Sequence, residues 1–162
     1  MLWMFGKTLE NVWGAKRFLI YYIITGLGAA MIYILFVQYQ IYGISDNFPE
    51  LLELAKEGKY SVGNTNSEKL SQLVLSPMVG ASGAVYGLLL AFGMLFPNTL
   101  LYIYFAIPIK AKYVVMALGG IALFSGIMNN PADNIAHFAH LGGMIFGFIL
   151  LKYWQKNNTQ FY

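Results

Sequence analysis

Residues 80–87 read Gly-Ala-Ser-Gly-Ala-Val-Tyr-Gly, and residues 139–147 read Ala-His-Leu-Gly-Gly-Met-Ile-Phe-Gly. Each stretch lies near the start of an apolar segment that is predicted to be a helix. The first brings a serine, and the second a histidine, into surroundings where a polar side chain is costly unless it is hydrogen-bonded or functional. A hydroxyl within hydrogen-bond reach of an imidazole can act as a nucleophile with its base. These two stretches decide the fold and the chemistry that the sequence predicts.

The composition is that of a membrane protein. Of the 162 residues, 58% are hydrophobic and 10% are charged, against about 25% charged residues in a soluble domain, and the mean hydropathy is +0.58. The length predicts a single domain over residues 1–162, an all-α bundle of membrane helices. The absence of cysteine excludes disulfides and thiolate metal ligands. Because the basic residues gather at predicted helix ends, no nucleic-acid partner is expected.

Four apolar segments are long enough to be considered as spans: about 18–42, 80–96, 111–128 and 134–154. The second is expected to end at Pro97-Asn98, because proline cannot continue a helix. Residues 99–109, between the second and third spans, are aromatic and β-branched and are expected at the membrane interface. Residues 44–76 form a long loop, predicted to hold two amphipathic pieces on the bilayer surface or to be a plain solvated loop.

The distribution of basic residues predicts the orientation. With four spans, one face of the membrane receives Lys7, Lys16, Arg17, Lys110, Lys112, Lys152 and Lys156. The other face receives three lysines, and these are offset by acidic residues of the 44–76 loop. The positive-inside rule then puts the first face in the cytoplasm and the long loop outside. Compact loops without sorting signals favour a bacterial inner membrane.

The first six residues are apolar and too few to cross a bilayer, which needs about 20. They are expected to be the end of a helix whose beginning is missing. A short buried N-terminal arm is the alternative.

The serine and the histidine are predicted at similar depths. Ser82 lies about 21 Å from the inner end of its segment, and His140 lies about 18 Å from Lys152. Both are nearer the outer face, so contact is possible if the two helices are neighbours. Small residues let helix backbones approach closely in lipid, and such residues follow both positions: Gly80, Gly83 and Gly87 on one helix, Gly143 and Gly147 on the other.

Tyr86 lies one turn after Ser82 on the same helix face, where its ring could hold an imidazole. Each of these signals has a plainer interpretation when taken alone. The glycines can serve packing with an incidental serine, and an intramembrane histidine is more often an interhelical hydrogen-bonding residue than a catalyst. His137 and His140 could share a metal, but the sequence has no third histidine, no cysteine and no HExxH pattern, so no metal site is expected. A small-solute transporter is disfavoured because the spans carry no buried acidic residue.

Taken together, these residues resemble those of the rhomboid intramembrane serine proteases. The resemblance covers nearly the whole chain. It is carried by Leu9-Glu10 with 14–18, by GxSGxxY from 80 to 86, and by AHxxGxxxG from 139 to 147.

The resemblance implies that Ser82 is the nucleophile, that His140 is the base and acid, and that Tyr86 stacks on the catalytic imidazole. Gly80 and Gly83 would support the oxyanion site, while Gly143 and Gly147 would pack the helices. It also implies no cofactor, and single-span membrane proteins cut within the lipid bilayer as substrates.

The first helix of the rhomboid fold, and most of its second helix, have no counterpart in this sequence. No residue can therefore take the roles of the family's histidine and asparagine that face the oxyanion, so impaired activity is expected. The alternative is a non-proteolytic rhomboid-like protein that binds client helices.

Overall fold

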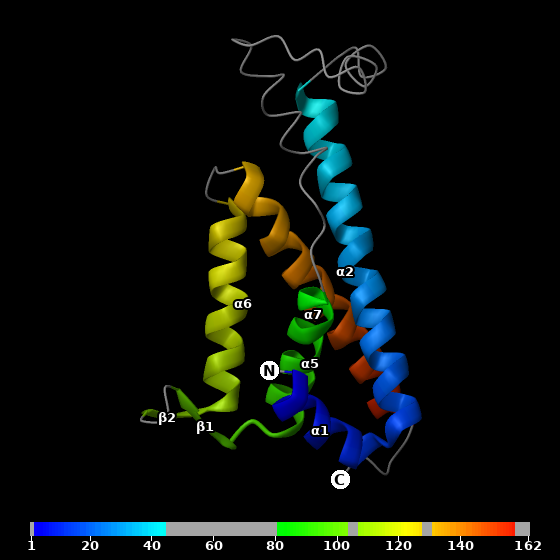
Figure 1. Cartoon of the computed structure of the whole chain (residues 1–162), viewed down its shortest axis with the longest axis vertical. Helices are drawn as coiled ribbons and strands as arrows, with labels where there is room; N and C mark the ends of the chain where they lie inside the picture. The colour runs from blue at the N-terminus through cyan, green and yellow to red at the C-terminus, as the bar shows by residue number, and fades with distance from the viewer. Residues whose placement is uncertain (1, 45–80, 104–106, 128–130, 158–162) are drawn as a thin grey trace.

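The computed structural model describes residues 2–44, 81–103, 107–127 and 131–157. Its described elements are the helices α1 (Leu2–Trp13), α2 (Ala15–Ile44), α5 (Ser82–Leu95), α6 (Ala111–Ile127) and α7 (Pro131–Asn157) and the strands β1 (Leu100–Ile103) and β2 (Ile107–Lys110). Figure 1 shows α2 and α6 standing on either side of α5 and α7, with α1 and the sideways-pointing hairpin at the end at which α6 begins. The predicted all-α bundle is confirmed. The predicted surface pieces within 44–76 lie outside the described residues, as does Gly80.

Helix α1 is amphipathic and turns into α2 at a single glycine. It buries Phe5, Leu9 and Trp13 against the bundle. Gly14 separates the two helices with φ of +78°, a left-handed conformation that glycine adopts without the cost borne by other residues. The described apolar residues near the start of the sequence therefore belong to a helix that packs on the bundle.

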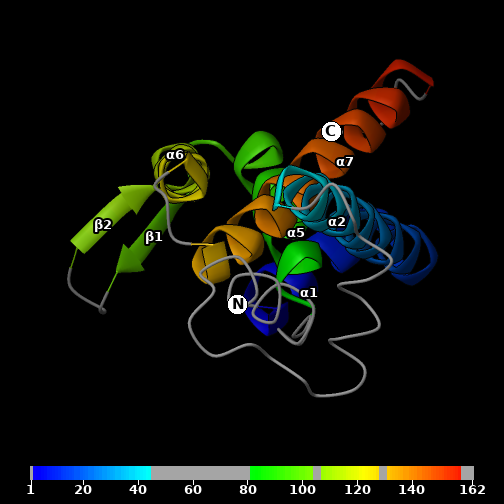
Figure 2. The ribbon, with the colours of Figure 1, turned by 90° about the horizontal axis from the view of Figure 1, so that it is seen from above.

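Helices α2, α5 and α7 form the centre of the molecule. Each of these three helices packs against the other two, and α6 packs mainly against α7. Figure 2 shows the hairpin beside α6, pointing away from the other helices. The short α5 is the most buried element, since Leu88, Leu89 and Ala91 are fully enclosed or nearly so. Its end is set by Phe96 and Pro97, as the sequence predicts: the Phe96 N–H still donates to Phe92 O (2.8 Å), and the chain then leaves the helix.

Small residues allow the central helices to approach. A Cβ at Gly143 of α7 would collide with the backbone carbonyl of Gly83 on α5. One turn further along α5, a Cβ at Gly87 would meet Thr25 of α2 and the carbonyl oxygen of Gly143. Backbones this close exclude larger side chains and give van der Waals contact, the main source of helix association in lipid.

The outer surfaces of the bundle are apolar. Large side chains more than half exposed include Leu27 and Ile34 on α2, Met116 and Phe124 on α6, and Ile149 on α7. By length and apolarity, one helix among the described residues, at Ala15–Tyr42, could cross a membrane, while Ser82–Leu95 and Ala111–Ile127 are shorter apolar helices. The four-span arrangement stays a prediction.

The hairpin is the one described element that the sequence did not predict. Residues 99–109 were expected at the membrane interface with no secondary structure assigned, and this region forms two antiparallel strands with Leu101 opposite Ile109 and Tyr102 opposite Pro108. Each strand has only four residues, and proline within a strand argues against a strand prediction. The strands form because they pair with each other, and no local sequence pattern reveals that pairing.

Candidate active site

Ser82 is the first residue of α5 and is exposed. Ala81 occupies the N-cap position and supplies no side-chain hydrogen bond to the helix. The first backbone N–H groups of a helix have no partner inside the helix. The Ser82 hydroxyl therefore lies beside backbone donors at the positive end of a helix dipole, where an anion is stabilised.

His140 comes from α7 and meets the serine directly. Its Nε2 lies 3.1 Å from Ser82 Oγ, a hydrogen-bonding distance. When the ring proton is on Nδ1, the hydroxyl donates to Nε2, which is the arrangement a general base requires. Nδ1 is buried and has no hydrogen-bond partner among the described residues.

Two rings enclose the His140 imidazole. Tyr86, one turn after Ser82 on α5, stacks on it with centroids 4.0 Å apart and planes 5° apart. His137, one turn before it on α7, lies edge-on with centroids 6.2 Å apart and planes at 78°. The close parallel stack of Tyr86 limits the orientations that the imidazole plane can take. Among the described residues no three His, Asp or Glu side chains gather as a metal site.

The glycines beside the pair determine how closely the two helices approach. A Cβ at Gly83, next to Ser82, would meet Ala29 of α2 and would lie 3.1 Å from the Ala139 carbonyl oxygen. Gly143, one turn after His140, meets the Gly83 backbone, and a Cβ at Gly147 would meet the Tyr21 hydroxyl. Gly80, the remaining residue predicted near the oxyanion, is not among the described residues.

Two polar residues of α2 that the sequence analysis did not single out lie beneath the pair. Tyr21 is fully buried, and its hydroxyl donates to the carbonyl oxygen of Gly87 on α5 (3.0 Å). Thr25 is also fully buried and donates to Tyr21 O (2.8 Å) on its own helix. The signal that could have revealed them is a pair of polar side chains one turn apart in an otherwise apolar segment, because these side chains share a helix face.

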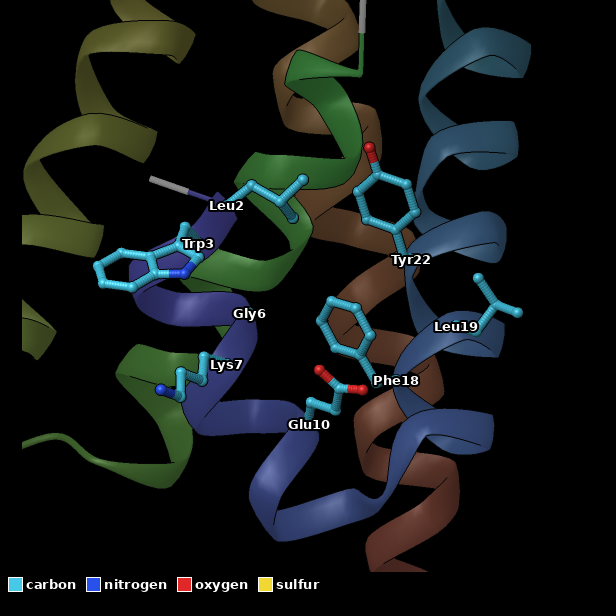
Figure 3. A pocket seen from close by; sticks show the side chains of 8 residues that line it. All are labelled: Leu2, Trp3, Gly6, Lys7, Glu10, Phe18, Leu19 and Tyr22. Atoms are coloured by element: carbon cyan, nitrogen blue, oxygen red, sulfur yellow. The ribbon is translucent and has the colours of Figure 1, made fainter.

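A cavity lined by described residues lies elsewhere. It has a volume of about 530 Å³ between α1 and the start of α2. Figure 3 shows Trp3 and Lys7 on one wall and Phe18 and Tyr22 on the other. None of Ser82, Tyr86 or His140 lines it.

Comparison with known proteins gives a family. The sequence model of the Rhomboid domain matches residues 1–156. The chain is 25% identical over 155 residues to "Rhomboid protein 1, mitochondrial" of Saccharomyces cerevisiae, an alignment that covers 96% of this chain and 36% of that protein. It is 34% identical over 88 residues to an uncharacterized mitochondrial rhomboid protein of Schizosaccharomyces pombe, covering 50% of this chain and 22% of that protein.

The chain thus spans about a third or less of the length of these two relatives. No solved structure matches. The domain match over almost all of the sequence shows that the chain belongs to the rhomboid family.

Proposed function

We propose that this chain carries the catalytic centre of an intramembrane serine endopeptidase, with Ser82 as the nucleophile and His140 as its base. The observation that carries the proposal is the 3.1 Å separation of Ser82 Oγ and His140 Nε2 from two different helices. Membership of the rhomboid family supports two parts of this proposal: that the protein is integral to a membrane, and that the reaction is serine-type proteolysis.

In the proposed reaction, Ser82 Oγ attacks a peptide carbonyl carbon while its proton passes to His140 Nε2. The negative charge that develops on the carbonyl oxygen is met by backbone N–H groups at the start of α5, the Ser82 N–H among them. His140 then gives the proton to the leaving amine as the C–N bond breaks, which leaves an acyl ester on Ser82. Water, deprotonated by His140, releases the acyl group and restores the hydroxyl.

Tyr86 is proposed to hold the imidazole in place during these proton transfers. The nearly parallel stack at 4.0 Å limits rotation of the ring, and a base must stay within hydrogen-bond reach of the proton that it takes. Gly83 and Gly143 are proposed to act indirectly. They let α5 and α7 approach closely enough for the two catalytic side chains to meet. No cofactor enters the proposed reaction.

The proposed substrates are single-span membrane proteins, cut within or beside their span. Helix α5 has 14 residues, so the Ser82 hydroxyl lies about 20 Å from its inner end and inside a hydrocarbon layer about 30 Å thick. A bacterial inner membrane and a site open toward the extracytoplasmic side stay predictions, and both relatives above carry mitochondrial names. The expectation that the 162 residues by themselves have impaired protease activity also stays a prediction.

The test combines a probe and a reporter. The chain in lipid nanodiscs is treated with a fluorophosphonate, which reacts covalently with an activated serine, and separately with a reporter protein that has one transmembrane span. We expect labelling at Ser82, its loss in Ser82→Ala and in His140→Ala, and no change in Ser125→Ala, a serine on α6. Reporter cleavage is expected to follow the same pattern in a longer form that also carries the family's first two helices, and to be weak or absent with the 162 residues by themselves.

Labelling or cleavage that survives in both Ser82→Ala and His140→Ala contradicts the proposal. A folded protein that binds the reporter span but never reacts with the probe favours the alternative, a non-proteolytic binder of client helices.

A further inference from the structure

The β1–β2 hairpin has two chemically different faces. Side chains of a strand alternate between the faces of the sheet, and paired residues of neighbouring strands share a face. The pairing of Leu101 with Ile109 therefore puts both on one face with Ile107. The pairing of Tyr102 with Pro108 puts these two on the other face, together with Lys110 and its partner Leu100.

The face that carries Leu101, Ile107 and Ile109, called the aliphatic face below, contacts the helix bundle at one end and extends past it at the other. Leu101 is partly buried and packs against the hydrophobic core, whereas Ile107, further along the same face, is 57% exposed. Figures 1 and 2 show why: the strands run sideways from the base of α6, away from the other helices. An aliphatic surface thus extends past the bundle on the side from which α6 rises.

The hairpin cannot lie inside hydrocarbon, because a two-stranded sheet leaves backbone N–H and C=O groups unpaired along both outer edges. It adjoins an apolar surface nonetheless. Tyr113, Met116 and Phe124 on α6 are all more than half exposed. At the junction of hairpin and helix lie Lys110 and Lys112, the latter with its ammonium group 5.1 Å from the Tyr113 ring centroid. Tyrosine and lysine at the edge of an apolar surface are typical of the headgroup layer.

We propose that the hairpin docks on the bilayer itself, lying flat in the phospholipid headgroup layer at the basic end of the bundle. Its Leu101–Ile107–Ile109 face rests on the acyl chains, and its Tyr102–Lys110 face meets headgroups and water. This inference depends on the membrane placement proposed above and not on the chemistry of Ser82.

The position of the hairpin in the chain gives this contact a consequence. The hairpin directly follows α5, which begins at Ser82, and directly precedes α6. An element held at the headgroup layer fixes the inner end of α5, and the rigid helix then fixes the distance of Ser82 from that surface. The hairpin thereby sets the depth of the serine.

The absence of cysteine from the sequence makes a clean labelling test possible. In the Ser82→Ala background, single variants Ile107→Cys and Tyr102→Cys receive a nitroxide spin label in vesicles of phosphatidylcholine and phosphatidylglycerol. Relaxation is measured with oxygen, which concentrates among acyl chains, and with a water-soluble nickel complex. Phe124→Cys on α6 is the lipid-facing reference, and Lys156→Cys near the end of α7 is the aqueous reference.

We expect the label at 107 to respond to oxygen like the one at 124, and the label at 102 to respond more strongly to nickel. If Tyr102→Cys does not fold, Leu100→Cys, on the same face and 48% exposed, replaces it. Equal nickel access at 107 and 102 overturns the proposal, since the hairpin then stands in water. Protection at 107 from both reagents, with spin–spin broadening, also overturns it, because a second copy then covers the face. Failure of probe labelling at Ser82 in the unsubstituted protein leaves these results unaffected.

Discussion

At the scale of single residues, the proposal concerns how the His140 imidazole is held. Its Nε2 is 3.1 Å from the serine hydroxyl, while the Tyr86 ring lies parallel to it. Tyr86→Phe keeps the stacked ring and removes only the hydroxyl, so the rate of probe labelling is expected to stay within about threefold. Tyr86→Ala removes the ring, and the rate is expected to fall about tenfold or more, because a misplaced base loses much of its typical 10²–10⁴-fold contribution.

Labelling rates and thermal unfolding in one detergent check this expectation. Equal rates for Tyr86→Ala and the unsubstituted protein, at equal stability, would show that the stack has no role in positioning.

At the scale of helices, two glycines are required for different reasons. Gly143 is needed for space: its Cβ would meet the backbone of Gly83, which cannot move aside as a flexible side chain can. Gly143→Ala is therefore expected to lower the free energy of unfolding by about 1–3 kcal/mol or more and to reduce probe labelling by separating α5 from α7. Gly120→Ala on α6 is the matched control, because nothing lies within 4 Å of its added Cβ.

Melting temperature and labelling rate, measured for both variants, test this interpretation. A Gly143→Ala protein as stable and as reactive as Gly120→Ala would contradict the close approach of α5 and α7.

Gly14 is needed for its backbone conformation. Nothing lies within 4 Å of an added Cβ, but φ is +78°. Gly14→Ala is therefore expected to cost about 1–2 kcal/mol from backbone strain alone, and Gly14→Asn is expected to cost less, since asparagine tolerates this conformation better. Thermal unfolding of the two variants gives the comparison. An alanine variant more stable than the asparagine variant would exclude strain as the cause.

At the scale of the whole molecule, one buried tyrosine connects its own helix, α2, to three others. Tyr21 of α2 donates to Gly87 O on α5, lies where Gly147 of α7 has no side chain, and packs on Trp13 of α1 with ring centroids 4.9 Å apart. Tyr21→Phe is expected to lower the free energy of unfolding by about 0.5–1.5 kcal/mol, the usual net value of a hydrogen bond. Tyr39→Phe, at a tyrosine that is 76% exposed, is expected to leave stability unchanged.

Chemical or thermal unfolding of both variants under identical lipid conditions measures the difference. A Tyr21→Phe protein that matches Tyr39→Phe would mean that the hydroxyl contributes nothing across the helix interface.

The parts of the fold that could be predicted are those that depend on the local sequence, such as the length of an apolar run and the proline that ends it. Apolar runs ended by Pro97 and Pro131 locate α5 and α6 to within a few residues, and the all-α class follows from composition. Helix α7 begins and ends further out than the predicted 134–154, since polar residues at a helix end weaken the apolar signal without stopping the helix. The hairpin was missed because its two short strands are stabilised by each other.

For the candidate site, the sequence by itself determined which residues are the candidates: a serine and a histidine in apolar segments, each followed by glycines one turn apart. That these two residues are catalytic stays a prediction. The tertiary structure alone decided that α5 and α7 are neighbours, that Ser82 and His140 face one another, and that Tyr21 joins α2 to both. The physical reason is that periodicity along a chain fixes which face of a helix is small or polar. The choice of partner for that face depends on the packing of all the helices at once.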